Sequence, residues 1–176
     1  MRSALLFVAA CSSPSDPVIT HDSMMADADL ASHCLIQGNY GALGAITGTA
    51  GTSQGGDTTL TFVLANDANG KDDLFFRLVA GKGVFAGGVA AGTYAIAGAD
   101  ASYATCGLCT NLIADITSSG PAKFYFAATG SVTLNTVTAP ITGTASNLHF
   151  TEIDISTGAT VSDCTGDIAS VSFTAN

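Results

Sequence analysis

The stretch Thr59–Val79, with the sequence TLTFVLANDANGKDDLFFRLV, decides the fold. On both sides of its polar middle, apolar residues occupy every second position, at Leu60, Phe62 and Leu64 and again at Leu74, Phe76 and Leu78. A period of two is the spacing of side chains on one face of a β-strand. The middle, residues 66–72, is rich in Asn, Asp and Gly, which tolerate the backbone angles of tight turns. The stretch therefore predicts a β-hairpin.

Similar runs follow along the chain, each ended by Gly, Asn, Asp or Pro. Together with the two hairpin strands they give about nine strands, the further runs being residues 43–49, 92–97, 112–116, 123–127, 131–138, 141–155 and 168–174. No long stretch keeps a helical period, so βαβ crossovers are not expected. Short, closely spaced strands predict a single antiparallel β-sandwich or barrel. In the run 141–155 the apolar phase slips near Thr151 and Glu152, which predicts a bulge or corner there.

The composition agrees with one β domain and limits its partners. The 176 residues leave room for a single domain and a short extension. Charged residues make up 11% of the chain, where about 25% is usual, so the polar surface comes mostly from Ser, Thr, Asn and the backbone. Five Lys and Arg stand against fourteen Asp and Glu, giving a net charge of −9 with no basic cluster to neutralise phosphates. We expect no nucleic-acid partner.

The first residues predict export. Arg2 precedes an apolar segment, Ala4–Ala10, and Cys11 follows at once, so residues 1–10 have the order of a secretory signal peptide. The stretch Val8–Cys11 resembles the lipobox of bacterial lipoproteins, which implies cleavage before Cys11 and acylation of that cysteine. The segment before Cys11 is shorter than the roughly 15–30 residues of a signal peptide, which is consistent with a start codon further upstream. The alternative is a short buried first strand with Cys11 as an ordinary thiol.

The segment after Cys11 favours the anchor. Ser12–Pro17 alternates Ser with Pro and Asp, a composition that does not pack and separates a domain from a membrane. We therefore expect residues 11–33 to be a disordered, lipid-anchored tether and residues 34–176 to be the β domain. The expected location is the bacterial outer membrane or cell surface, with the membrane contacted through the lipid.

Four further cysteines indicate disulfides, because an exported chain with an even number of cysteines commonly pairs them. Four cysteines allow three pairings. A bridge between Cys34 and Cys164 ties the two ends of the domain, and Cys106 and Cys109 then close on each other. Two alternatives stay open: a redox-active Cys-x-x-Cys, which needs a helix where residues 110–116 resemble a strand, and a four-thiolate zinc site, which needs a second close pair.

The hairpin loop contains the best candidate metal site. Asp67, Asn69, Asp72 and Asp73 offer oxygen ligands of the kind that calcium prefers, placed around Gly70. Their spacing departs from that of an EF-hand, and calcium sites of extracellular modules are weak, so such a site would be structural. The alternative is a polar turn without metal. We expect no other cofactor.

Two patterns point to hydrolysis and are weaker. Residues 51–55 match G-x-S-x-G around Ser53, but a nucleophile elbow requires a helix after the serine, whereas another strand follows. Glu152 and Asp154 would project from the same strand face about 7 Å apart, a separation compatible with glycoside hydrolysis. The chain has no Trp to stack on a sugar. A secreted hydrolase using Ser53 or the Glu152–Asp154 pair is therefore the alternative function.

A family resemblance supports the anchor. The segments Gly92–Tyr94, Tyr103–Cys109, Gly130–Leu134 and Ile141–Phe150 resemble uncharacterised surface lipoproteins of myxobacteria, and the likeness extends from roughly residue 36 to the end. The resemblance implies export and an all-β fold, without an activity, a cofactor or a functional residue. Three His, one Glu and three Lys are few acid–base groups. We therefore expect a non-enzymatic envelope lipoprotein that serves surface structure or binds a partner, an envelope protein or a polysaccharide, through its loops.

Overall fold

The computed structural model describes residues 33–66 and 71–176. Eight strands account for most of this part of the chain: β1 (Asn39–Thr52), β2 (Thr58–Asn66), β3 (Lys71–Leu78), β4 (Gly92–Ala95), β5 (Leu108–Ile116), β6 (Lys123–Leu134), β7 (Ile141–Ile153) and β8 (Thr160–Ala175). Two short 3-10 turns, η1 (Gly83–Phe85) and η2 (Gly98–Ala101), interrupt the long connection between β3 and β5. Within the described ranges, no helix has the length and apolar character needed to cross a membrane.

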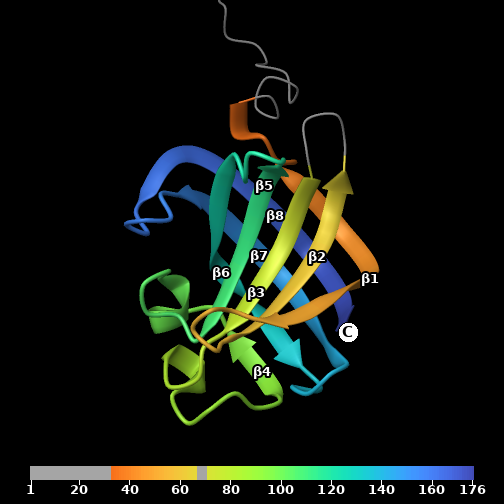
Figure 1. Cartoon of the computed structure of the whole chain (residues 1–176). Helices are drawn as coiled ribbons and strands as arrows, with labels where there is room; N and C mark the ends of the chain where they lie inside the picture. The colour runs from red at the N-terminus through yellow and green to blue at the C-terminus, as the bar shows by residue number, and fades with distance from the viewer. Residues whose placement is uncertain (1–32, 67–70) are drawn as a thin grey trace, which may run out of the picture.

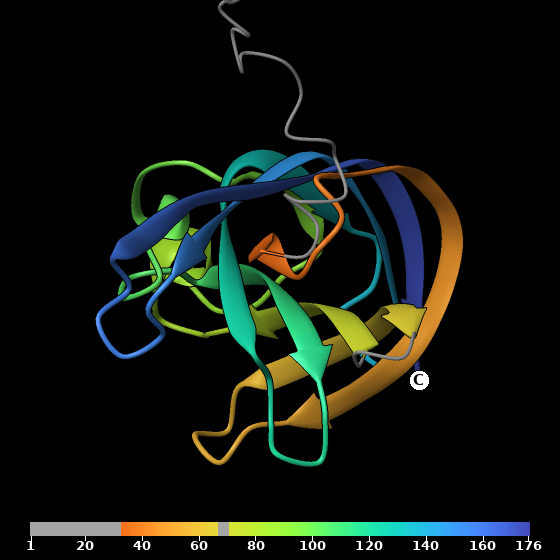
Figure 2. The same ribbon diagram turned by 90° about the horizontal axis from the view of Figure 1, so that it is seen from above.

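Seven of the strands close into a barrel (Figures 1 and 2). The order around the ring is β6-β5-β3-β2-β1-β8-β7 and back to β6, while β4 pairs with the lower half of β6 outside the ring. The expected all-β fold is confirmed, as a barrel. All neighbours run antiparallel except β1 and β8, which are parallel. The expectation of a wholly antiparallel sheet was wrong because strand directions cannot alternate all the way around a ring of seven.

The predicted hairpin is confirmed, but the number of strands is eight and not nine. In the hairpin, Leu60 lies opposite Phe76 and Phe62 opposite Leu74. The runs 123–127 and 131–138, expected as two strands, form the single strand β6. The register of β6 against β7 shifts twice between Ala127 and Ser131, and Gly130 has a positive φ of 129°. The glycine therefore bends β6 through a bulge without ending it.

The irregularity expected near residue 151 is also present. The register of β7 against β8 breaks between Thr151 and Ile153. Leu148 and Phe150 pack in the barrel core, whereas Ile153 belongs to a second apolar cluster. The change of phase in the sequence thus marks the point in β7 where the apolar side chains stop pointing into the barrel and begin to pack on its outer side.

Side chains fill the inside of the barrel. Phe62, Phe76 and Phe173 meet there with ring centroids 5.2–6.0 Å apart, and each is at most 3% exposed. Barrels of this size have an interior just wide enough for packed side chains. The inward residues form one continuous cluster that reaches all seven strands of the ring. The interior is a hydrophobic core.

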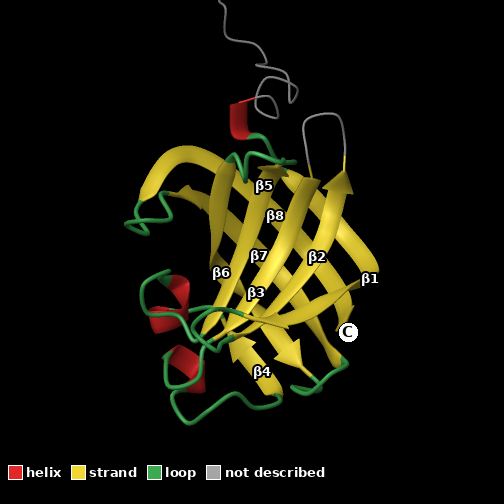
Figure 3. Cartoon of the chain, viewed as in Figure 1, coloured by secondary structure: helices red, strands yellow, loops and turns green. Residues whose placement is uncertain are grey.

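Each end of the barrel is covered by chain. Residues 33–38 lie within the ring of strands at the upper end (Figure 2), where Cys34 bonds to Cys164 of β8 and its carbonyl accepts a hydrogen bond from the Tyr125 hydroxyl. At the lower end, the connection that carries η1, η2 and β4 packs against the barrel (Figure 3), with Phe85 fully buried. Both mouths are therefore occupied by residues of this chain.

Candidate functional site: a pocket on the outer wall of β3, β5 and β6

The outer side of β3, β5 and β6 carries a second apolar layer. Its buried members are Val79, Cys106, Cys109, Phe126 and Ile153, and Tyr103 and Phe124 pack against them. Tyr103 meets Phe126 edge-to-face at 5.7 Å, a favourable geometry for two aromatic rings. On this side the strands are buried on both faces.

A buried carboxylate holds the connection that covers this layer. Asp100, 2% exposed, accepts hydrogen bonds from the backbone N–H groups of Val84 at 2.9 Å and of Gly107 and Leu108 at 2.8 Å. The close approach requires glycine at two positions. A Cβ added to Gly83 would lie 2.4 Å from an Asp100 carboxylate oxygen, and a Cβ added to Gly107 would lie 2.1 Å from a backbone carbonyl oxygen. Asp100 therefore fixes the chain on either side of Tyr103.

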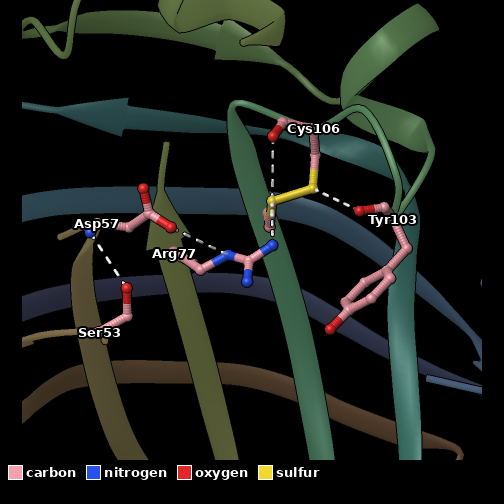
Figure 4. A network of polar contacts seen from close by, with 6 residues as sticks. Ser53, Asp57, Arg77, Tyr103 and Cys106 are labelled. Atoms are coloured by element: carbon pink, nitrogen blue, oxygen red, sulfur yellow. Dashed lines mark hydrogen bonds and ion pairs between the residues drawn. A yellow bond between two sulfur atoms is a disulfide. The ribbon is translucent and has the colours of Figure 1, made fainter. Parts of the chain in front are cut away.

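The Cys106–Cys109 disulfide lies in the same layer, beside Arg77 of β3 (Figure 4). Arg77 Nη2 lies 3.9 Å from Cys109 Sγ, a weak acceptor. The guanidinium carbon lies 5.9 Å from the centre of the Tyr103 ring, within the range of a cation–π contact. On the other side, Arg77 Nε lies 3.9 Å from Asp57 Oδ2, a distance beyond that of a hydrogen bond. Buried Arg77 Nε has no hydrogen-bond partner in the described residues.

Next to Arg77 the layer leaves a small pocket of about 50 Å³. Its lining comes from β3, β5, β6, the connection before β5 and the turn after β7, and consists of Phe75, Arg77, Tyr103, Asn111, Ile113, Phe124 and Ile155. The strand register brings these lining residues together, because Phe75 lies opposite Asn111 and Ile113 lies opposite Phe124 on neighbouring strands. Asn111 is 6% exposed, and its side-chain amide makes no hydrogen bond to a described residue. The pocket thus combines apolar walls with two polar groups that lack full partners.

The disulfide pairing expected between Cys34 and Cys164 and between Cys106 and Cys109 is present. All four sulfur atoms are bonded in pairs, which leaves no thiolate for the zinc alternative. Residues 108–116, after Cys106, form strand β5. The helix N-terminus that a thioredoxin-like cysteine needs does not follow this Cys-x-x-Cys.

The structure separates the described members of the calcium candidate. Asp72 accepts hydrogen bonds from the Tyr40 hydroxyl at 2.8 Å and the Asp115 N–H at 3.1 Å. The burial of the Tyr40 hydroxyl and the neighbouring Asp72 carboxylate raise the pKa of Tyr40. Asp73 instead forms an ion pair with Lys71 at 3.2 Å. Both acids lie within β3, where successive side chains alternate between faces. Asp72 and Asp73 therefore do not project from the same face of β3. Asp67 and Asn69 lie outside the described residues, so the calcium site stays a prediction; the described residues contain no group of three or more His, Cys, Asp or Glu that could hold a metal.

Glu152 and Asp154 do not share a strand face, contrary to expectation. Buried Glu152 pairs with Lys123 Nζ at 2.9 Å and accepts a hydrogen bond from Ser162 Oγ at 2.5 Å. Strand β7 ends at Ile153, so Asp154 stands in the following turn. There the Ser156 hydroxyl, followed by the N–H groups of Ser156 and Thr157, lowers the pKa of exposed Asp154.

Ser53 belongs to the turn between β1 and β2. Its Oγ accepts a hydrogen bond from the Asp57 N–H at 3.1 Å, and its N–H donates to the Asp57 carbonyl at 2.9 Å. Both flanking elements are strands paired antiparallel. The serine closes a hairpin and is not on a strand-to-helix elbow.

Sequence reasoning missed the pocket because it placed binding in loops. A signal was present: LFFRLV in β3 and LCTNLIADI in β5 carry large residues at successive positions, as strands covered on both faces do. Comparison of the chain with protein-family models, with curated proteins and with solved structures gave no match. The case for a function therefore comes from this chain's own residues.

Proposed function

We propose that this chain is an exported, non-enzymatic envelope lipoprotein whose barrel binds a partner through the outer wall of β3, β5 and β6. The observation that carries the proposal is a contrast in packing. The barrel interior is filled with side chains, of which Phe62 and Phe76 are at most 1% exposed. The outer pocket is lined by Arg77, whose buried Nε has no hydrogen-bond partner within the described residues. Buried polar groups are normally paired, so a partner that supplies acceptors at the pocket gains their bonds.

The positions of the candidate hydrolytic residues support a binding role. Glu152 is held by Lys123 and Ser162, Ser53 closes a hairpin, and Asp154 caps a turn. General acid–base catalysis needs such groups to converge on one site. These three lie on separate structural elements and each has a partner of its own.

The lipid anchor is tested by mass spectrometry of the mature chain and by its sedimentation with membranes. The motif Val8–Cys11 predicts a mature chain that begins at an acylated Cys11 and sediments with membranes. Replacement Cys11→Ser is expected to release the chain into the soluble fraction. Native protein that retains an unmodified Met1 and is soluble would refute the anchor.

The binding role is tested by photo-crosslinking in the native envelope. A photoreactive residue replaces Ile155, which is 42% exposed at the pocket rim, or Ser172 as the matched exposed position on β8, away from the pocket. We expect one adduct of defined mass from position 155 and none from 172. The same adducts from both positions, or none from either, would count against binding through this wall.

A further inference from the structure

We infer that the pocket on β3, β5 and β6 binds the carboxyl-terminal residue of a partner protein, with an apolar side chain on the pocket walls and its carboxylate on Arg77. This inference rests on the proposed function and assigns its ligand chemistry. Three features carry it: a guanidinium whose buried Nε has no partner among the described residues, an Asn111 amide on the pocket lining, and an apolar cavity too small for a long ligand.

Arg77 is the cation with the most unused hydrogen-bonding capacity in the pocket. A guanidinium has five N–H donors in a planar fork that matches a carboxylate. Within the described residues, the only side-chain hydrogen bond of Arg77 goes to a weak sulfur acceptor. Its ion pair with Asp57, at 3.9 Å, is longer than those of Lys71 at 3.2 Å and Lys123 at 2.9 Å. A ligand carboxylate at hydrogen-bond distance is therefore a better partner than Asp57.

Asn111 supplies the second polar contact. It lies opposite Phe75 of β3 on one side and opposite Phe126 of β6 on the other, so aromatic rings flank it and water is largely excluded. A carboxamide both donates and accepts hydrogen bonds, as does the peptide unit before a terminal residue. A ligand peptide unit at the pocket would give this amide a hydrogen-bond partner.

The shape of the pocket selects a chain end. About 50 Å³ holds roughly three to five water-sized groups, so one side chain enters and a passing chain or a sugar polymer does not. The walls are Phe75, Ile113, Phe124 and Ile155, which favour an aliphatic or aromatic side chain. A free small acid buries too little surface for tight binding, whereas a terminal residue brings the contacts of its whole protein.

The test is a fluorescence-anisotropy titration of the full-length chain in detergent with the labelled peptide Ser-Gly-Ser-Gly-Gly-Val, whose side chain matches the pocket volume. We expect the free carboxylate to bind at least tenfold more tightly than the amidated peptide. Arg77→Gln is expected to weaken binding at least tenfold, while Lys82→Gln, an exposed cation away from the pocket, leaves it unchanged. Circular dichroism verifies that each variant is folded.

The variant Asp57→Asn distinguishes a binding role of Arg77 from a purely structural one. Removing the competing carboxylate frees Arg77, so we expect three- to tenfold tighter binding, although the variant loses an ion pair. Equal binding of acid and amide, or no tightening by Asp57→Asn, would overturn the inference. Equal affinity for free 3-methylbutanoate and for the peptide would also overturn it in favour of a small acid. A crosslink at position 155 without peptide binding would leave the proposed function standing and refute only this ligand.

Discussion

Two walls of the same barrel use their outward side chains in opposite ways. The covered wall, formed by the outward residues of β3, β5 and the upper half of β6, lies beneath a second apolar layer. The hydroxyl wall, formed by the outward residues of β7 and β8, faces solvent with Thr142, Thr144, Ser146, Ser170, Ser172 and Thr174. A shallow cleft of about 200 Å³ runs between Gly44 of β1 and these hydroxyl groups.

The contrast shows why an unsatisfied polar group has different consequences on each wall. On the exposed side the hydroxyls bond to one another, as Ser131 does with Ser146 at 3.0 Å, or to water. On the covered wall Arg77 Nε is buried and has no hydrogen-bond partner among the described residues, which is a real deficit. The proposed binding site therefore lies in the covered wall, although the hydroxyl wall is more polar.

One disulfide lies in the barrel core and the other in the layer over the covered wall, and they give the largest predicted difference. Cys34–Cys164 closes a separation of 130 residues onto β8, and Cys106–Cys109 closes one of 3 within the covering layer. Because loop-closure entropy grows with loop length, replacing the first pair by Ala should cost about 5 kcal/mol of unfolding free energy and the second about 2. Urea titration of both double variants measures this, after non-reducing peptide mapping has verified the pairs. Equal losses would contradict the entropic ranking.

The next largest difference is expected in the unfolding free energy lost when a side chain is truncated on each wall. Phe126→Ala removes a ring that is 4% exposed and packed on Tyr103, so we expect a loss of about 3 kcal/mol. Ser172→Ala, the matched deletion on the hydroxyl wall, should change stability by no more than about 0.5 kcal/mol. Urea unfolding of the two variants decides it. If the serine variant loses as much as the phenylalanine variant, the hydroxyl wall is not simply solvated.

Asp100→Asn should loosen the covering layer by a smaller amount. The amide keeps one acceptor but turns an NH₂ group toward backbone N–H donors that Asp100 now satisfies, so we expect a loss of about 2 kcal/mol. Hydrogen exchange should quicken at Val84, Gly107 and Leu108 before the core strands respond. Lys82→Gln in the same connection is the control. Uniform exchange changes throughout the barrel would argue against a local role for Asp100.

The smallest effect concerns pH at a solvated turn. The folded-state pKa of Asp154 is lowered by the Ser156 hydroxyl and by neighbouring N–H groups. Its contribution is therefore complete above the unfolded-state pKa of about 4 and disappears as pH falls through the folded value. Asp154→Asn should lower Tm slightly at pH 6 and not at pH 2. Exposed Asp163→Asn controls for the lost charge, and an Asp154 effect that persists at pH 2 would disprove this origin.

Local periodicity predicted pairings well where partners are near in sequence. The hairpin of β2 and β3 follows from alternation and a turn. The two disulfides were expected from the even number of cysteines and the predicted export, and both are present. Errors arose at element ends. Taking the strand to begin at Leu74, and not at Lys71, placed Asp72 and Asp73 in one loop, although alternation puts them on opposite faces. Extending β7 past Ile153 joined Glu152 with Asp154 in the same way.

The sequence by itself determined the strands, the acidic and weakly charged surface, and the cysteines available for bridging, because these depend on residue type and short-range spacing. Only the tertiary structure decided the closure of β1 on β8, the filled interior and the pocket around Arg77. Those features join residues from β3, β5, β6 and two connections. Their proximity depends on register and closure of the whole ring, and no local pattern encodes that.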